Sequence, residues 1–190
     1  MPSLISPAGF DRTHVFTLAH TYYLPFGRGR RFLSDAHGVT GIMLDGWRFN
    51  GITTAESGLP FSPGLNNNAS LNADMSLRPN ITGDLLSGIA QNRNQWFNPA
   101  VYAVPGAFLF GNAPCNSLRG PKLFSADFAL AKDFSLTERY KLEFRWENFN
   151  TFNNTNLALP DSAVDSGTAG KIFDVASPMR NMQFALKLKF

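Results

Sequence analysis

The sequence is poor in several features that would mark other classes of protein. It has a single cysteine, Cys115, so the chain cannot form an internal disulfide. Its apolar runs are short pieces such as Ala107–Phe110, far below the ~18 residues that a membrane-spanning helix needs. The 17 Lys and Arg residues exceed the 14 Asp and Glu residues by only three, and they are spread along the chain. A disulfide-stapled module and a helical membrane protein are therefore excluded, and nucleic-acid binding gains little support.

Phenylalanine, by contrast, is abundant, with 18 residues in the chain. In the segment 140–147 aromatic and apolar side chains take every second position, and Lys141, Glu143, Arg145 and Glu147 take the positions between them. A helix would scatter the apolar set around its circumference, whereas a strand with a different environment on each face requires this period. The segment predicts a strand between an apolar and an aqueous medium.

Four other segments alternate in the same way, with His20 and Lys132 as polar exceptions on otherwise apolar faces. The last eleven residues follow the pattern and end on Phe190 in the apolar phase. Each segment has roughly ten residues, the length that a tilted barrel strand needs to cross a membrane. We expect five strands, near residues 12–24, 46–56, 122–134, 139–150 and 180–190.

The links between these strands differ in length in a regular order. Pro25–Gly46 is moderate, 57–121 is long, Ser135–Arg139 is short and 153–179 is long. Long structureless stretches are uncommon in compact soluble domains, but outer-membrane barrels have short periplasmic turns and long outer loops. We therefore expect an all-β fold: an antiparallel meander of about five strands, the C-terminal part of a large transmembrane β-barrel with two long extracellular loops. The expected location is the outer membrane of a Gram-negative-type bacterium, and the first ten residues carry no signal-peptide pattern.

An ordered set of short motifs supports this interpretation. They are Asp45-Gly-Trp-Arg-Phe-Asn-Gly-Ile52, Ser57-Gly-Leu-Pro-Phe61, Arg78-Pro-Asn80, Trp96-Phe-Asn-Pro99, Asn116-Ser-Leu-Arg-Gly-Pro121, Phe149-Asn-Thr-Phe-Asn153 and Gln183-Phe-Ala-Leu-Lys-Leu-Lys-Phe190. The set resembles the C-terminal barrel region of TonB-dependent outer-membrane receptors, in particular the Oar-like group with a carboxypeptidase-regulatory-like domain. The resemblance runs from about Asp11 to Phe190.

The resemblance implies a plugged barrel of about 22 strands that takes up an unidentified substrate, of which residues 1–190 form a part. Implied partners are outer-membrane lipid, the remaining barrel strands and plug domain, and an energy-transducing inner-membrane complex reached through a missing N-terminal part. A terminal aromatic on an alternating last strand is the family's signal to the barrel assembly machinery. The residues that match this signal are Phe184, Leu186, Leu188 and Phe190.

No residue set predicts catalysis, a cofactor or a metal site, and we expect no enzyme activity. Glu143 and Glu147 alternate with cations, which favours a ladder of opposite charges over acid–base chemistry. His14 and His20 stand ~20 Å apart at strand rise, too far to bind one metal. Phe26–Phe32 (FGRGRRF) lacks the Walker spacing of a phosphate loop and is better interpreted as a solvated link or a basic turn near lipid headgroups.

The two faces of the expected strands divide the candidate site residues. Those expected to face the lumen are Lys141, Glu143, Arg145 and Glu147. Those expected to meet lipid, or to form the interfacial aromatic girdle, are Trp47, Phe49, Tyr140, Leu142, Phe144 and Trp146.

Two other functions compete with the transporter. A secreted β-sandwich carbohydrate-binding module would show the same alternation, with the aromatic residues in a closed core and the product soluble. A hydrolase is the weakest alternative, because no nucleophile, base and orienting group can be placed together. Nucleic acid is not an expected partner.

Overall fold

The computed structural model describes residues 6–66 and 77–190, which form two compact units. The sheet unit comprises Phe16–Ala55, Phe124–Asn154 and Pro178–Phe190. The loop unit comprises Glu56–Leu123, Thr155–Ser177 and the described residues up to Val15. The sheet unit contains the strands that the alternation predicts, and the loop unit contains most of the two long links.

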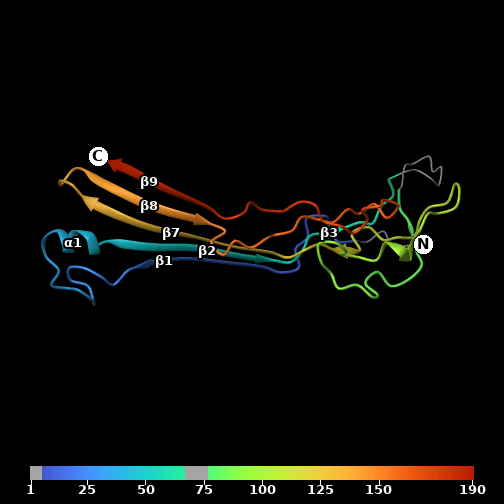
Figure 1. The fold of residues 1–190 in the computed structure, drawn as a ribbon, viewed down its shortest axis with the longest axis horizontal. Coiled ribbons are helices and arrows are strands. Elements are labelled where there is room, and N and C mark those ends of the chain that lie inside the picture. Colours follow the sequence, from blue (N-terminus) through green and yellow to red (C-terminus); the bar gives the residue numbers. More distant parts are fainter. Residues whose placement is uncertain (1–5, 67–76) are drawn as a thin grey trace. The chain divides into compact units, whose positions relative to one another are not determined.

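Five antiparallel strands form one sheet in the order β1-β2-β7-β8-β9 (Figure 1). Each of these long strands therefore pairs with the long strand that comes next in the sequence. Their bounds lie within three residues of the expected ranges. They are β1 Val15–Tyr23, β2 Trp47–Glu56, β7 Leu123–Ser135, β8 Lys141–Phe149 and β9 Asn181–Lys189. The predicted all-β meander of five strands is confirmed.

The register of β8 shows how alternation becomes two chemically different faces. Phe144 lies opposite Lys132 of β7 and Leu186 of β9, whereas Glu143 lies opposite Asp133 and Lys187. Successive side chains of a strand point to opposite faces, so the same phase runs across all three strands. We call the two sides the aromatic face and the charged face.

Within the sheet unit, no described residues form a second sheet over the aromatic face. Phe184 and Leu186 of β9 are 71% and 69% exposed, and Phe16 and Leu18 of β1 are also exposed. A β-sandwich would bury these side chains between two sheets. The exposure contradicts the soluble-sandwich alternative. Exposed apolar area of this extent marks an interaction surface.

Asparagines fix the start of the link between β8 and β9. Asn150 and Asn153 have φ angles of 48° and 53°, a region that Asn tolerates better than most residues. The buried Asn150 amide donates to the carbonyl oxygens of Asn154 (2.9 Å) and Pro178 (3.1 Å), and Asn153 accepts from the Arg180 amide (3.1 Å). Both ends of the link are therefore fastened together at the edge of the sheet.

The loop unit is folded, which corrects the expectation of structureless loops. Its core consists of Phe61, Phe97 and Leu118. Two small antiparallel sheets support it, β3 (Pro60–Phe61) with β6 (Leu118–Arg119) and β4 (Asn80–Ile81) with β5 (Tyr102–Ala103). These strands have only two residues each, too short for alternation to reveal them.

The motif Trp96-Phe-Asn-Pro99 acquires a structural role in this unit. Phe97 is fully buried, and the Trp96 indole N–H donates to the Arg119 carbonyl at 2.7 Å. The Asn98 side chain accepts from the Ala100 amide at 3.1 Å and caps the short 3₁₀ helix η1 (Pro99–Val101). Pro99 stands at the first helical position, where its missing N–H costs nothing.

The helix α1 (Gly38–Leu44), in the link between β1 and β2, was not predicted. Its seven residues are too few to show a helical period. The Trp47 indole donates to the Met43 carbonyl at 2.9 Å, and Gly41 packs so closely on the Ala36 carbonyl that a Cβ would lie 2.5 Å from it. None of the helices in the described ranges is long and apolar enough to cross a membrane.

Replacing Tyr102 by Phe is expected to leave the loop unit as stable as before, or to stabilise it by up to about 1 kcal/mol. The buried Tyr102 hydroxyl has no hydrogen-bond partner among residues 6–66 and 77–190, and burial raises the pKa of Tyr102 to about 12. Chemical unfolding followed by tryptophan fluorescence measures the change, and an absorbance titration should lose a component near pH 12 in Tyr102→Phe. A clear loss of stability would show that the hydroxyl has a partner after all.

Asp161 is expected to make the link between β8 and β9 sensitive to acid. Burial alone would raise the pKa of Asp161, but hydrogen bonds from the Thr168 hydroxyl (2.5 Å), the Ala163 amide (3.0 Å) and Ser166 lower it below its usual value. A lowered folded-state pKa gives stability that is present above the unfolded pKa and is lost as the pH falls through the folded value. Hydrogen exchange of residues 161–171, corrected for intrinsic rates, should therefore accelerate below about pH 4. In Asp161→Asn this acceleration should be largely absent, and an equal response in both proteins would contradict the assignment.

Candidate functional site

Ionic side chains and one amide on the charged face form a continuous strip across β2, β7, β8 and β9. Each lies in the polar phase of its strand, because these strands alternate in register. The members of the strip are Arg48, Asp133, Glu143, Arg145, Glu147, Gln183 and Lys189.

Glu143 is the centre of this strip. Only 8% of its side chain is exposed, and it contacts cations from three strands. The Arg48 and Arg145 guanidinium groups each lie 3.7 Å from its carboxylate, and the Lys189 ammonium hydrogen-bonds to it. Asp133 shares two of these cations, with Lys189 at 3.1 Å and Arg48 at 3.2 Å. The cluster ties β2, β7, β8 and β9 together through charge.

A second cluster continues the strip toward the long links. Arg145 pairs with Glu147, and the Gln183 amide donates to the other carboxylate oxygen of Glu147. Gln183 lies directly opposite Glu147 in the register of β8 and β9. Along this part of the face, Glu147 has a partner on its own strand and another on β9.

Beside the strip, the charged face is hollowed. The hollow has a volume of about 450 Å³ and is lined by β1, β2, β7 and β8, including Thr21, Asn50, Asp127, Arg145 and Glu147. The Thr21 hydroxyl donates to the Asn50 side chain at 2.9 Å across the floor. Its lining combines hydroxyl, amide, carboxylate and guanidinium groups with apolar side chains, among them Ile52, Phe128 and Phe149.

The structure gathers the four predicted lumen residues on this face. Lys141, Glu143, Arg145 and Glu147 share one side of β8, as the sequence suggests, and whether that side is a lumen stays a prediction. The sequence also shows Arg48, Asp133 and Lys189 in polar phase, but it does not show that they meet Glu143, because that requires the strand order and register.

The predicted lipid-facing residues share the opposite side. Trp47 and Phe144 pack edge to face at 6.2 Å between ring centroids, and Trp146 stacks on Phe184 at 6.3 Å with an interplanar angle of 11°. Phe49 belongs to the same side, as its contact with Phe128 at 5.2 Å shows, and Leu142 lies opposite Leu188. Tyr140 directly precedes the first residue of β8, and its place in the interfacial girdle stays a prediction.

The two polar exceptions on the aromatic face each have an accommodating neighbour. His20 packs against Phe49 and Phe128, over Gly51, where a Cβ would lie 2.4 Å from its ring. Lys132 is 1% exposed, and its ammonium hydrogen-bonds to the Asp45 carbonyl below the rings of Trp47 and Phe134. Cation–π contact and one hydrogen bond replace water around this charge.

The predicted assembly signal forms an exposed apolar row. Phe184, Leu186 and Leu188 alternate along β9, the edge strand, and Phe190 follows its last residue with 87% of its surface exposed. The row continues the aromatic face to the end of the sheet. Its recognition by assembly machinery stays a prediction.

In residues 6–66 and 77–190 no group of three or more His, Cys, Asp or Glu side chains is placed to hold a metal ion. Cys115, in the loop unit, is an exposed free thiol.

Comparison with known proteins gives one match. The family model described as "Outer membrane beta barrel domain" matches residues 3–183. No curated protein and no solved structure matches the chain.

Proposed function

Since the chain belongs to the family of outer-membrane β-barrel domains, we propose that it forms part of the wall of a TonB-dependent transporter that takes up a solute. The protein is an outer-membrane barrel protein, so its aromatic face has a lipid phase to meet. The observation that carries the proposal is the separation of the sheet into an exposed aromatic face and a charged, hollowed face. The ordered motifs of the sequence point to the TonB-dependent class.

The open edges of the sheet support a larger barrel. Among the described residues, β1 and β9 each pair on one side only, which leaves a row of backbone donors and acceptors on the other. A bilayer offers these groups no partner, so a spanning sheet must close. Further strands, a plug domain within the lumen and an energy-transducing inner-membrane complex are the partners that this proposal requires.

The link lengths give the orientation. β7 and β8 are joined by the short turn 136–140, and β1 and β2 by residues 24–46. The links at the other strand ends, 57–122 and 150–180, contribute the loop unit. Outer-membrane barrels place their long links outside the cell. In this proposal the loop unit is therefore extracellular, and the two shorter links, residues 24–46 and 136–140, are periplasmic.

Thiol labelling of intact cells tests this orientation. A membrane-impermeant maleimide is expected to label Cys115, because the thiol is exposed in the loop unit. A matched variant with Cys115→Ser and Glu138→Cys carries its thiol in the short turn and should react only after the cells are opened. The reverse pattern would show that the loop unit faces the periplasm. If neither thiol is labelled in intact cells, the loop unit is not exposed on the cell surface.

The loop unit offers a first contact for the solute. It contains a hollow of about 640 Å³ lined by His14, Gln91, Trp96, Arg119 and Lys122, among others. Apolar side chains such as Leu86 and Trp96 line it together with a few amide and cationic groups, which is the usual composition of a small-molecule site. In the proposed cycle a solute binds outside and then passes the charged strip.

Planar-bilayer recordings of the protein containing this chain distinguish the transporter from a passive pore. A plugged, energy-driven barrel should remain electrically silent without its inner-membrane partner. Steady spontaneous conductance in the wild-type protein would refute energy-dependent uptake while leaving the outer-membrane barrel intact.

A further inference from the structure

The link between β1 and β2 contains a rigid basic turn. Residues Phe26–Phe32, the arginine turn, close on themselves: the Gly27 amide donates to the Phe32 carbonyl and the Phe32 amide to the Pro25 carbonyl, each at 3.0 Å. Gly27, with a φ of 108°, approaches Asp45 so closely that a Cβ would lie 2.7 Å from its Cα. The turn is thereby held against the residue that follows α1.

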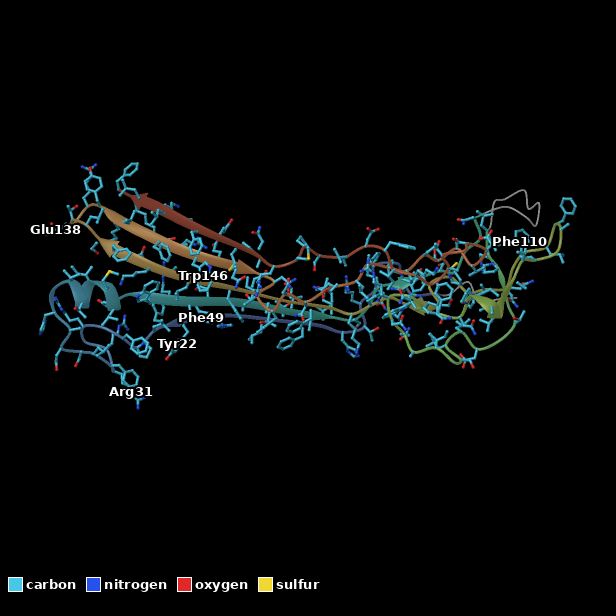
Figure 2. The ribbon with its side chains drawn as sticks, in the orientation of Figure 1. Tyr22, Arg31, Phe49, Phe110, Glu138 and Trp146 are labelled. Atoms are coloured by element: carbon cyan, nitrogen blue, oxygen red, sulfur yellow. The ribbon has the colours of Figure 1, made fainter. Side chains whose placement is uncertain are left out.

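Its three arginines are available to an outside ligand. Arg28, Arg30 and Arg31 are exposed, and none of them forms a salt bridge with any residue that the structure describes. Figure 2 shows Arg31 projecting from the link away from the strands, and its guanidinium also lies 5.5 Å from the centroid of the Phe32 ring. Three unpaired guanidinium groups within four residues attract anions, above all phosphate.

Beside the turn, α1 exposes an apolar face. Val39, Ile42 and Met43 share one side of the helix by their spacing and are 76%, 61% and 53% exposed. An apolar helix face beside a cluster of arginines is the pattern of a segment that lies in a membrane interface.

Two contacts place α1 on the membrane side of the sheet. Trp47 donates to the Met43 carbonyl, and Lys132 donates to the Asp45 carbonyl. Trp47 and Lys132 both belong to the aromatic face, so the end of α1 lies over that face and not over the charged one. The apolar side of α1 therefore continues the surface that meets lipid.

We propose that the arginine turn and α1 form a surface anchor that binds the phosphate headgroups of anionic phospholipids in the periplasmic leaflet of the outer membrane. The choice of leaflet rests on the orientation proposed above. The arginines bind the headgroups and α1 inserts Val39, Ile42 and Met43 among the upper acyl chains. Charge complementarity and continuity with the aromatic face identify the occupant.

The protein containing this chain, placed in nanodiscs that leave both membrane surfaces open, tests the anchor. Trypsin cleavage after Arg28, Arg30 and Arg31 is compared with cleavage after the exposed Lys171 of the loop unit. In nanodiscs with 30% phosphatidylglycerol in phosphatidylcholine, cleavage at the arginines relative to Lys171 should be at least tenfold lower than in nanodiscs of phosphatidylcholine alone. The reason is that each arginine near an anionic surface contributes about fivefold in binding. In 1 M salt, where the screening length is about 3 Å, the difference should disappear. Equal cleavage in both lipids would overturn the proposal, and stronger protection by lipid A than by phosphatidylglycerol would overturn the choice of leaflet.

A pair of triple variants provides an independent readout. Replacing Arg28, Arg30 and Arg31 by Gln should reduce the phosphatidylglycerol that co-purifies with the protein by at least tenfold. A control that replaces Lys122, Lys171 and Arg180 by Gln removes the same charge and should retain the lipid. If both variants lose the same amount of phosphatidylglycerol, net charge alone explains lipid retention, and the anchor proposal is wrong.

Labelling of Cys115 on intact cells, done on the same variants, separates this proposal from the proposed orientation. Normal Cys115 labelling with unchanged lipid retention would refute the anchor alone. Loss of Cys115 labelling in the wild-type protein would refute the orientation.

Discussion

Phe144→Arg is expected to reduce assembly of the protein in the outer membrane by destabilising the inserted state by ~2 to 4 kcal/mol. Phe144 lies in the middle of β8 on the aromatic face, between the rings of Trp47 and Phe184. A guanidinium there would have to enter the hydrocarbon region, and neither ring offers it a hydrogen bond. The measurement is the amount of folded protein in outer-membrane fractions, together with chemical unfolding in lipid vesicles.

Gln183→Arg is the matched control for this prediction, because it adds the same side chain to the other face of the same sheet. Gln183 lies opposite Glu147 and already donates to its carboxylate, so an arginine there gains an ion pair. Assembly should remain close to that of the wild-type protein, and Arg145→Ala should also be tolerated. If both arginine variants assemble equally well, the aromatic face does not meet lipid.

Glu143→Gln is expected to lower the free energy of unfolding by about 1.5 to 3 kcal/mol, the range for a hydrogen bond to a charged group. The substitution keeps the shape of the side chain but leaves Arg48, Arg145 and Lys189 without their shared anion. Those cations are 30 to 45% exposed, so solvent screening keeps the effect below that of a fully buried pair. Guanidinium unfolding of the protein in detergent micelles measures it.

Glu138→Gln provides the comparison for Glu143. Glu138 lies exposed in the short turn between β7 and β8, where Figure 2 shows it at the end of the sheet, and it has no ion pair within the described ranges. Its loss should change stability by less than ~0.5 kcal/mol. Equal effects of the two substitutions would mean that the strip lines the face without holding the strands together.

The sheet could be predicted from the sequence because the alternation of a strand depends only on residues that are adjacent in the chain. Tyr140–Glu147 shows the alternation of β8 without any knowledge of its neighbours, and the strand ends followed from it. The meeting of Arg48 with Glu143 could not be predicted, since 95 residues separate them and only the strand order brings them together.

The parts that escaped prediction depend on contacts between distant or very short segments. Lys132 breaks the apolar pattern of β7, and only the position of Asp45 after α1 explains it. The core around Phe97 draws on strands of two residues that no period can reveal. The sequence therefore predicted the sheet with its two faces but predicted neither the helix of the first link nor the fold of the long links.

Asn150 donates to the Pro178 carbonyl, and Asn153 accepts from the Arg180 amide. These two hydrogen bonds make the pairing of β9 with β8 independent of the length of the link between them. With both ends joined at the rim, residues can be inserted or deleted between positions 155 and 177 while β8 and β9 keep their pairing. A slip of one residue in this pairing would turn every side chain of β9 to the wrong face, and the hydrogen bonds of Asn150 and Asn153 oppose such a slip. Changes within residues 155–177 can therefore alter this link without changing the pairing of β8 with β9.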